Sequence, residues 1–178
     1  LMFVEEPVLC ENEEEFLELR RSSNIPIAAG ERNFTRWGFK SMLLHGGVDI
    51  VQPDVSHCGG ILELRKIAAM AETFDVAVAP HCPLGPIALA ACLQVDFCTP
   101  NAFIQEQSAG IHYNEGYDLL HYLKDPSVFQ YKNGYAQLLT KPGLGIEIDE
   151  TYVRKMDQIG HNWHNPVWRD ADNAIAEW

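Results

Sequence analysis

Residues 48–81 read VDIVQPDVSHCGGILELRKIAAMAETFDVAVAPH and contain one complete strand–helix–strand unit. Residues 48–54 are mainly apolar and end in Asp54, which is typical of a strand buried in a parallel sheet. The glycine pair at 59–60 predicts the start of a helix, whose apolar face consists of Ile61, Leu64, Ile67, Ala68, Ala71 and Phe74. Residues 76–81 are apolar again and end in His81. The stretch therefore predicts two parallel strands that are joined by a helix.

The same unit recurs before and after this stretch. Strands are predicted at residues 1–4, 25–29 and 102–106, and helices at residues 13–21, 37–44 and 87–95, the first of them capped by Asn12. An ionisable residue stands at or just beyond the end of each predicted strand: Glu5, Glu31, Asp54, His81 and Glu106, at intervals of 26, 23, 27 and 25 residues. Right-handed crossovers place the carboxyl ends of parallel strands on one side of the sheet. We therefore expect these five side chains to converge.

The repeat stops near residue 110. The remaining sequence contains turn-rich segments, a predicted helix at residues 150–158 and an irregular aromatic end. The chain has 178 residues, fewer than the roughly 250 of a complete (β/α)₈ barrel. We therefore expect an α/β fold in which residues 1–110 form part of a (β/α) barrel and residues 111–178 form a tail.

The composition excludes several classes of function. The net charge is −12, and no cluster of lysine and arginine provides the basic surface that nucleic acids or anionic membranes require. No run of 18 apolar residues predicts a membrane span, and no basic stretch followed by an apolar one predicts a signal peptide. The five cysteines are odd in number and lack a CxxC pair, which favours free thiols. These features predict a cytoplasmic protein, and the acidic balance permits a cation site.

The five strand-end residues suggest specific chemistry. Glu5 and Glu31 are hard oxygen donors of the kind that Mg²⁺ prefers. Asp54 can accept a hydrogen bond from one imidazole nitrogen of His81, which would make the other nitrogen a candidate general base. Glu106 could be a metal ligand, a hydrogen-bond partner of a developing oxyanion or a solvated strand end. The alternative is that charged residues follow strands because loops are polar, and that His81 has a purely structural role.

Other candidate residues are weaker. Cys82 follows His81 directly, and adjacent residues on a strand point to opposite faces, so a buried thiol is expected rather than a Cys–His dyad. His161 and His164 have an i, i+3 spacing but no acidic or cysteine neighbours, which favours a structural role. Residues 143–145 lack the third glycine of a nucleotide-binding fingerprint. His57 lies close after Asp54 and is expected at the rim of the site.

The motifs at these positions resemble those of the enolase superfamily. They are Val4-Glu5-Glu6-Pro7, Gly30-Glu31-Arg32, Gln52-Pro53-Asp54 with Gly59-Gly60, residues 80–86 (PHCPLGP), Phe103-Ile104-Gln105-Glu106 and Pro142-Gly143-Leu144-Gly145. The resemblance covers the whole chain and is to the mandelate racemase subgroup. The His81 segment and Asn165-Pro166-Val167-Trp168 point more narrowly to its galactonate dehydratases.

The resemblance implies a fold and a role for each site residue. The chain would supply strands 4 to 8 of an enolase-type TIM barrel, with Glu5 and Glu31 as Mg²⁺ ligands on strands 4 and 5. Asp54 and His81 would be the base dyad on strands 6 and 7, and Glu106 on strand 8 the partner of the enolised carboxylate. Dehydration of a galactonate-type sugar acid through an enediolate would yield a 2-keto-3-deoxy acid. Relatives form homo-oligomers, and the tail would also pack on an N-terminal capping domain.

Two alternative functions remain open at this point. A racemase or epimerase of the same superfamily would need a second base across the substrate. A non-catalytic half barrel would act as an assembly partner through the sheet edge that it leaves open. The family's first metal-binding aspartate and its neighbouring acid/base group are not found in this sequence. We therefore expect the chain to be the C-terminal part of a longer enzyme, negligibly active alone, with unknown stereospecificity.

Overall fold

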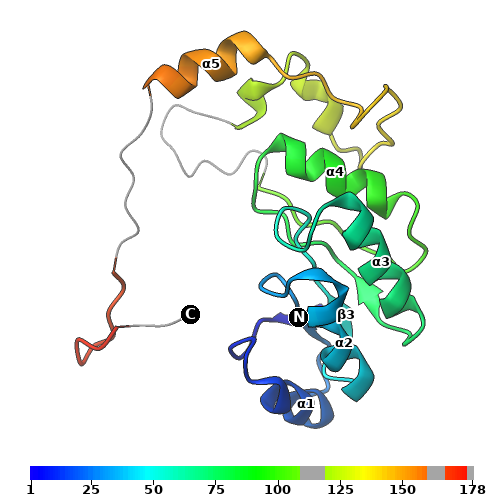
Figure 1. Cartoon of the computed structure of the whole chain (residues 1–178), viewed down its shortest axis with the longest axis vertical. Coiled ribbons are helices and arrows are strands. Elements are labelled where there is room, and N and C mark those ends of the chain that lie inside the picture. The colour runs from blue at the N-terminus through cyan, green and yellow to red at the C-terminus, as the bar shows by residue number, and fades with distance from the viewer. Residues whose placement is uncertain (109–118, 160–166, 176–178) are drawn as a thin grey trace.

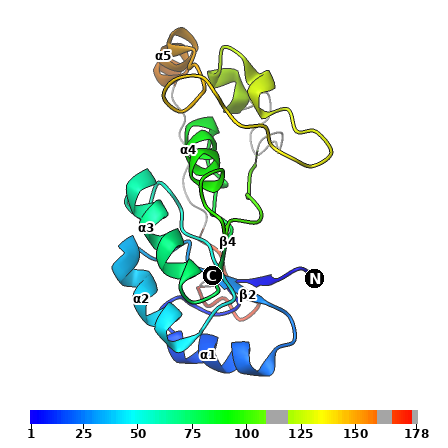
Figure 2. The same cartoon turned by 90° about the vertical axis from the view of Figure 1, so that its right-hand side faces the viewer.

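The computed structural model describes residues 1–108, 119–159 and 167–175. Its centre is a parallel four-stranded sheet in the order β1-β2-β3-β4, comprising β1 (Val4–Glu5), β2 (Ile27–Ala29), β3 (Ile50–Val51) and β4 (Ala77–Val78). The strands alternate with α1 (Glu13–Ser22), α2 (Thr35–His45), α3 (Ile61–Glu72) and α4 (Pro86–Asp96). Helices α1 to α3 follow one another along one side of the sheet (Figures 1 and 2). The predicted α/β class with a parallel sheet is confirmed.

The two faces of the sheet have different partners. Ile27, Ala29, Val51 and Val78 belong to the main core, together with Leu64 and Ile67 of α3 and other helix residues. The alternate residues Ala28, Ile50 and Ala79 form a second small cluster with Phe3. Because successive strand residues point to opposite faces, the helices cover one face and leave the other for the small cluster. This is the alternation expected of an arc of a (β/α) barrel.

The predicted strand at residues 102–106 is wrong in its extent. Only Ala102 forms a ladder contact, a parallel bridge to Val78, and Phe103 N–H donates to the Val78 carbonyl at 3.2 Å. The ladder cannot continue normally beyond this point because Pro80 has no N–H to donate. The Gln105 side chain instead donates to the Pro80 carbonyl at 2.9 Å. The segment therefore runs beside β4 without forming a full strand.

Other sequence-based expectations were corrected in detail. The described strands are shorter than predicted, whereas the helices match to within a few residues. Asn12 occupies the N-cap of α1, but its side chain makes no capping bond and contacts Glu15 at 3.5 Å instead. Ile61 and Phe74 were expected on the buried face of α3, yet each is 41% exposed. Ile61 lies in the first turn and Phe74 beyond the helix end, where neighbouring helices give less cover.

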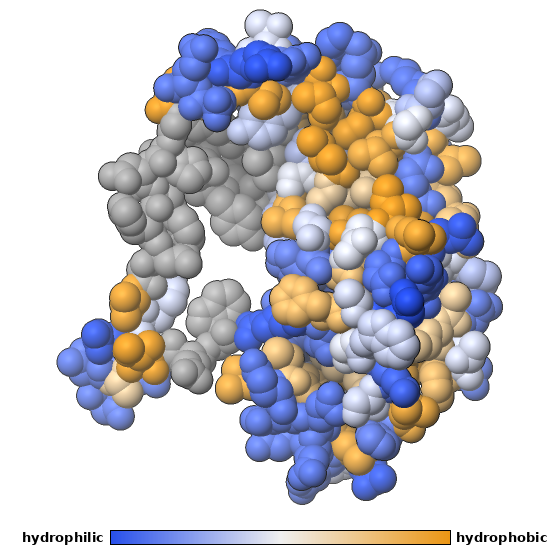
Figure 3. Space-filling model, in the orientation of Figure 1, coloured by the Kyte–Doolittle hydropathy of each residue, from blue (hydrophilic) through white to orange (hydrophobic). Residues whose placement is uncertain are grey.

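The tail packs on α4. Its described part contains the 3₁₀ helices η1 (Leu119–Tyr122) and η2 (Pro126–Phe129) and the helix α5 (Glu150–Ile159). Leu123, Phe129 and Leu139 join the main core. The Gln94 amide of α4 donates to the carbonyls of Leu139 at 3.0 Å and Leu144 at 3.3 Å. The visible surface is apolar around α4 and hydrophilic over α1 and α5 (Figure 3). The domain division at residue 110 stays a prediction.

The cysteines agree with a further expectation. Cys10, Cys58, Cys82, Cys92 and Cys98 are all free thiols. Within the described ranges, no helix is both long and apolar enough to cross a membrane.

Gly30 closes β2 in a conformation that only glycine adopts easily. Its φ is +132°, and a Cβ there would lie 2.5 Å from Cε1 of Phe39 and 3.2 Å from the Gln52 nitrogen. We expect Gly30→Ala to reduce the free energy of unfolding by about 2–4 kcal/mol, through backbone strain and overpacking. Urea unfolding would measure the loss. In the control Gly46→Ala, φ is +69° and nothing lies within 4 Å, so only about 1–2 kcal/mol should be lost. Equal losses would contradict the steric argument.

Asp96 at the end of α4 carries two buried oxygens without a hydrogen-bond partner among the described residues. Burial raises its pKa from 3.8 to about 7. Folding therefore favours the protonated carboxyl, and its contribution to stability is complete below pH 3.8 and lost as the pH rises through about 7. We expect Asp96→Asn to stabilise the protein by about 1–3 kcal/mol at about pH 8, with no gain near pH 4.

Thermal unfolding over this pH range would test the effect of Asp96. The control is Asp157→Asn at an exposed position of α5, which should change stability by less than about 0.5 kcal/mol at any pH. A gain for Asp96→Asn that does not depend on pH would contradict the assignment.

Candidate active site

Asp54 and His81 meet at the carboxyl ends of β3 and β4. The Nδ1 atom of His81 lies 2.8 Å from Oδ2 of Asp54. Asp54 is fully buried and also accepts a 2.6 Å hydrogen bond from the Ser56 N–H. Burial alone would raise the pKa of Asp54, but the hydrogen bonds from His81 and Ser56 outweigh it and hold the pKa below its usual range. Asp54 is therefore a charged acceptor that fixes the orientation of His81.

The second nitrogen of His81 faces Glu31, which follows β2. The Nε2 atom lies 3.2 Å from Oε2 of Glu31, so the imidazole stands between two carboxylates. Burial lowers the pKa of His81, but the hydrogen bond to Asp54 and the charges of Glu31 and Glu106 outweigh it, so the pKa is raised overall. The Nε2 nitrogen is therefore the one that faces the Glu31 carboxylate at the end of β2.

Glu5 at the end of β1 completes this side of the cluster. Its pKa is raised, mainly because burial disfavours its charge and also because Glu106 and Glu31 are negative neighbours. The next residue, Glu6, turns elsewhere, since its Oε1 accepts a 2.7 Å hydrogen bond from the Gly30 N–H. The negative charges of Glu31 and Glu106 therefore act on Glu5, whereas the Glu6 carboxylate holds the backbone at Gly30.

Glu106 is held next to His81 by the main chain. The Cys82 N–H donates to Oε2 of Glu106 at 2.8 Å. The Gln105 amide ties the two segments together by donating to the carbonyls of Pro80 at 2.9 Å and Glu106 at 2.6 Å. The Cys82 side chain is buried, as expected, so this residue contributes its amide to the site.

Two site residues, His57 and Gln105, add to the predicted set or sharpen it. His57 is half exposed, and its Nδ1 lies 3.8 Å from Oδ2 of Asp54 and 3.5 Å from the Glu31 carbonyl, in keeping with its expected place at the rim. The site role of Gln105 was not predicted. Its signal in the sequence is an amide within an otherwise apolar segment. His161 and His164 lie outside the described residues.

The donor set can be compared with the needs of a metal ion. Carboxylates such as Glu5 and Glu31 suit Mg²⁺, and a cation would relieve the repulsion from Glu106 and Glu31 that adds to burial in raising the pKa of Glu5. Among residues 1–108, 119–159 and 167–175, no three histidine, cysteine, aspartate or glutamate side chains gather closely enough to hold a metal. The two glutamates therefore fit part of a Mg²⁺ coordination shell.

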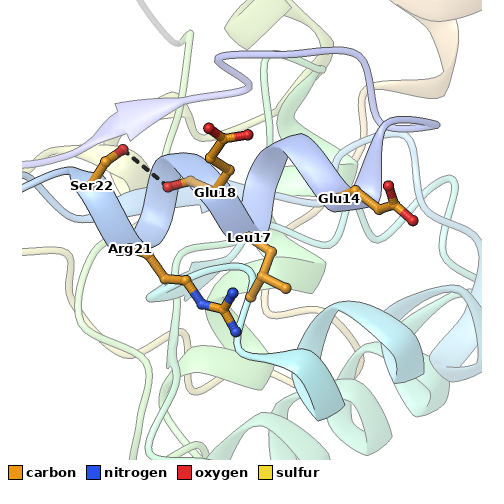
Figure 4. Close-up of a pocket in the computed structure, with 5 residues that line it drawn as sticks. All are labelled: Glu14, Leu17, Glu18, Arg21 and Ser22. Carbon is orange, nitrogen blue, oxygen red and sulfur yellow. Dashed lines mark hydrogen bonds between the residues drawn. The ribbon is translucent and has the colours of Figure 1, made fainter.

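A separate groove on the surface contains none of these site residues. Glu14, Leu17, Glu18, Arg21 and Ser22 line a groove along the outer helix α1 (Figure 4). The Ser22 hydroxyl donates to the Glu18 carbonyl within the helix itself. The groove belongs to one helix and contains none of the strand-end residues, so it is not part of the candidate site.

Comparison with known proteins identifies relatives of the whole chain. Residues 1–152 match the family described as "Enolase C-terminal domain-like". Proteins named D-galactonate dehydratase from Xanthomonas axonopodis pv. citri and Cronobacter sakazakii are each 58% identical over 177 residues, which is 99% of this chain and 46% of each relative. The chain therefore spans about half the length of these curated relatives.

Solved structures show the same fold. A putative galactarate dehydratase from Agrobacterium radiobacter, described as an enolase with bound Na and L-malate, matches with a TM-score of 0.84 and 32% identity over 97% of this chain and 45% of its own. A putative dehydratase from Salmonella enterica serovar Typhimurium matches with a TM-score of 0.79 and 31% identity, over 87% of this chain and 37% of its own. The parallel βα architecture, the family match and these relatives together establish that the chain belongs to the enolase C-terminal domain-like family.

Proposed function

We propose that this chain carries the base and two metal ligands of a Mg²⁺-dependent sugar-acid dehydratase of the galactonate type. The observation that carries the proposal is the His81 imidazole, held by Asp54 at 2.8 Å with its other nitrogen 3.2 Å from Glu31. The names of the relatives, D-galactonate dehydratase, support the substrate class. The family model supports the enolase type of chemistry.

Asp54 and His81 have different roles in proton removal. Asp54 accepts a hydrogen bond from the Nδ1–H of the neutral imidazole, so the lone pair is on Nε2. In this role Nε2 of His81 takes the proton from the carbon next to the substrate carboxylate. General-base catalysis of this kind contributes about 10²–10⁴-fold. Most of the reduction in the activation barrier must therefore come from stabilisation of the negative charge that develops on the substrate.

The acidic residues around His81 would provide this stabilisation through a metal ion and a hydrogen bond. Glu5 and Glu31 would hold Mg²⁺. When bound, the ion supplies Lewis-acid stabilisation of the substrate carboxylate as it becomes an enediolate, worth several kcal/mol. Glu106, which accepts a hydrogen bond from the Cys82 N–H, would in its protonated form donate a hydrogen bond to the oxygen on which charge develops. Loss of the neighbouring hydroxyl, with a proton from a general acid, would then give water and an enol, and the enol tautomerises to the 2-keto-3-deoxy acid.

The test is an assay of the full gene product with Mg²⁺ and a panel of aldonic acids. We expect 2-keto-3-deoxy product from galactonate or a close stereoisomer, and loss of turnover when the metal is chelated. If all these acids stay intact while another carboxylic acid exchanges its α-proton, the racemase alternative holds and the dehydratase proposal fails. The homo-oligomeric state and the cytoplasmic location stay predictions.

A further inference from the structure

His81 projects from a stretch of main chain that lies beyond the sheet ladder. Strand β4 ends at Val78, and Pro80, directly before His81, has no N–H to donate to a neighbouring strand. The imidazole nevertheless has a defined place, with its two nitrogens 2.8 Å from Asp54 and 3.2 Å from Glu31. The direction of this side chain depends on what holds the backbone from which it projects.

Two consecutive side chains of the neighbouring segment hold the peptide groups on either side of His81. The Gln105 amide donates at 2.9 Å to the Pro80 carbonyl, which belongs to the peptide group before His81. The Glu106 carboxylate accepts at 2.8 Å from the Cys82 N–H, which belongs to the peptide group after it. Because peptide groups are planar, only φ and ψ of His81 lie between these two groups. Holding both groups therefore restricts rotation on either side of the His81 Cα.

The Gln105 amide is used for its donor group alone. Its Nε2 atom also donates to the Glu106 carbonyl at 2.6 Å, so one NH₂ group bridges the two segments. The amide oxygen Oε1 is buried and has no hydrogen-bond partner among the described residues. Rotating the amide by half a turn would bring this oxygen against two carbonyl oxygens, which only accept.

This one-sided use of the amide distinguishes support of the main chain from packing. An apolar side chain of similar volume would fill the same space without leaving a buried oxygen unsatisfied. Such a side chain could not hold the carbonyl of Pro80, a residue that is fully buried. The chemistry of the amide is therefore explained by its hydrogen bonds to the backbone next to His81.

We propose that Gln105 is a positioning residue that directs the His81 imidazole between Asp54 and Glu31 by holding the Pro80 carbonyl. The inference rests on the proposed function, because it takes His81 to be the general base. Gln105 acts through the main chain and is not itself a catalytic residue. A reacting group that is misplaced by about 1 Å can cost about 10²-fold in rate, so a backbone restraint at the base affects turnover.

The experiment measures turnover by the full gene product with Mg²⁺ and galactonate, together with exchange of the substrate α-proton in deuterium oxide. Gln105→Met keeps a similar volume but removes the donor. We expect kcat and the exchange rate to fall about 10–100-fold, with KM within about threefold of the wild type, because the base is misdirected while the substrate contacts remain. Gln105→Asn, whose amide is one methylene shorter, should show the same loss and serves if the Met variant fails to fold.

The matched control is Ser108→Ala. It removes a 2.7 Å hydrogen bond from the buried Ser108 hydroxyl to the Pro83 carbonyl, which joins the same two segments two residues beyond His81. Both Ser108→Ala and Gln105→Met should unfold at a lower temperature, because each leaves a main-chain carbonyl without its partner. Only Gln105→Met should lose turnover, and Ser108→Ala should keep kcat within about twofold of the wild type.

The double variant Gln105→Met/His81→Asn distinguishes positioning of the base from a general disturbance. If Gln105 acts only through His81, its replacement should cost almost nothing once the base is gone. A multiplied loss would overturn the positioning role alone, and so would kcat values of Gln105→Met and Gln105→Asn within about twofold of the wild type. Full activity in His81→Asn, or no turnover of galactonate and its stereoisomers by the wild type, would overturn the proposed function and this role with it.

Discussion

Replacing His81 with asparagine is expected to lower the turnover of the sugar acid by about 10²–10⁴-fold. Asparagine can still hydrogen-bond to Asp54, but it has no basic nitrogen to take the α-proton. The His81 side chain is largely buried and contacts both Asp54 and Glu31, so the loss should appear in kcat more than in KM. Steady-state formation of the 2-keto-3-deoxy acid would measure it. Exchange of the substrate α-proton with deuterium oxide should fall in parallel.

The control is the same substitution at His57. This residue lies near Asp54 as well, but at 3.8 Å and with half of its side chain exposed. We expect His57→Asn to keep turnover within about tenfold of the wild type, because rim contacts contribute less than the base. Full activity in His81→Asn would refute the assignment of the base. An equal loss in both variants would show that disturbance of Asp54, rather than loss of a base, causes the effect.

The overall arrangement could be predicted from the sequence because it depends on regular physical patterns. Apolar runs that end in an ionisable residue recur at intervals of 23 to 27 residues, and right-handed crossovers then fix where the ends lie. The Asp54–His81 contact follows from two neighbouring strands of this set, and the structure brings the two side chains together. Their catalytic roles stay a proposal.

The details that could not be predicted depend on partners distant in the sequence. The segment at residues 102–106 has the composition of a strand, but Pro80 removes a ladder donor from the neighbouring strand end. The contact between His81 and Glu31 likewise depends on side-chain orientation, which a spacing of strand ends does not define.

Replacing Asp54 with asparagine is expected to reduce turnover by about 10²–10⁴-fold while preserving the fold. An asparagine amide can present its NH₂ to Nδ1 of His81, which stabilises the tautomer with the proton on Nε2 and so blocks the base. The hydrogen bond from Ser56 to the other oxygen, 2.6 Å in the wild type, can be retained by the amide oxygen. Measuring both turnover and thermal unfolding would distinguish a loss of catalysis from a loss of stability.

The double variant Asp54→Asn/His81→Asn tests whether the two residues act as one unit. If Asp54 works only by orienting His81, its replacement should cost almost nothing once the base is gone, and the double variant should resemble His81→Asn within about threefold. Independent roles would instead multiply the two losses. A multiplied loss would mean that Asp54 also acts outside His81, and His57 at 3.8 Å is the side chain through which it could do so. Adding His57→Asn to the double variant would then decide: it should cost almost nothing further if Asp54 also acts through His57, and should multiply the loss if it does not.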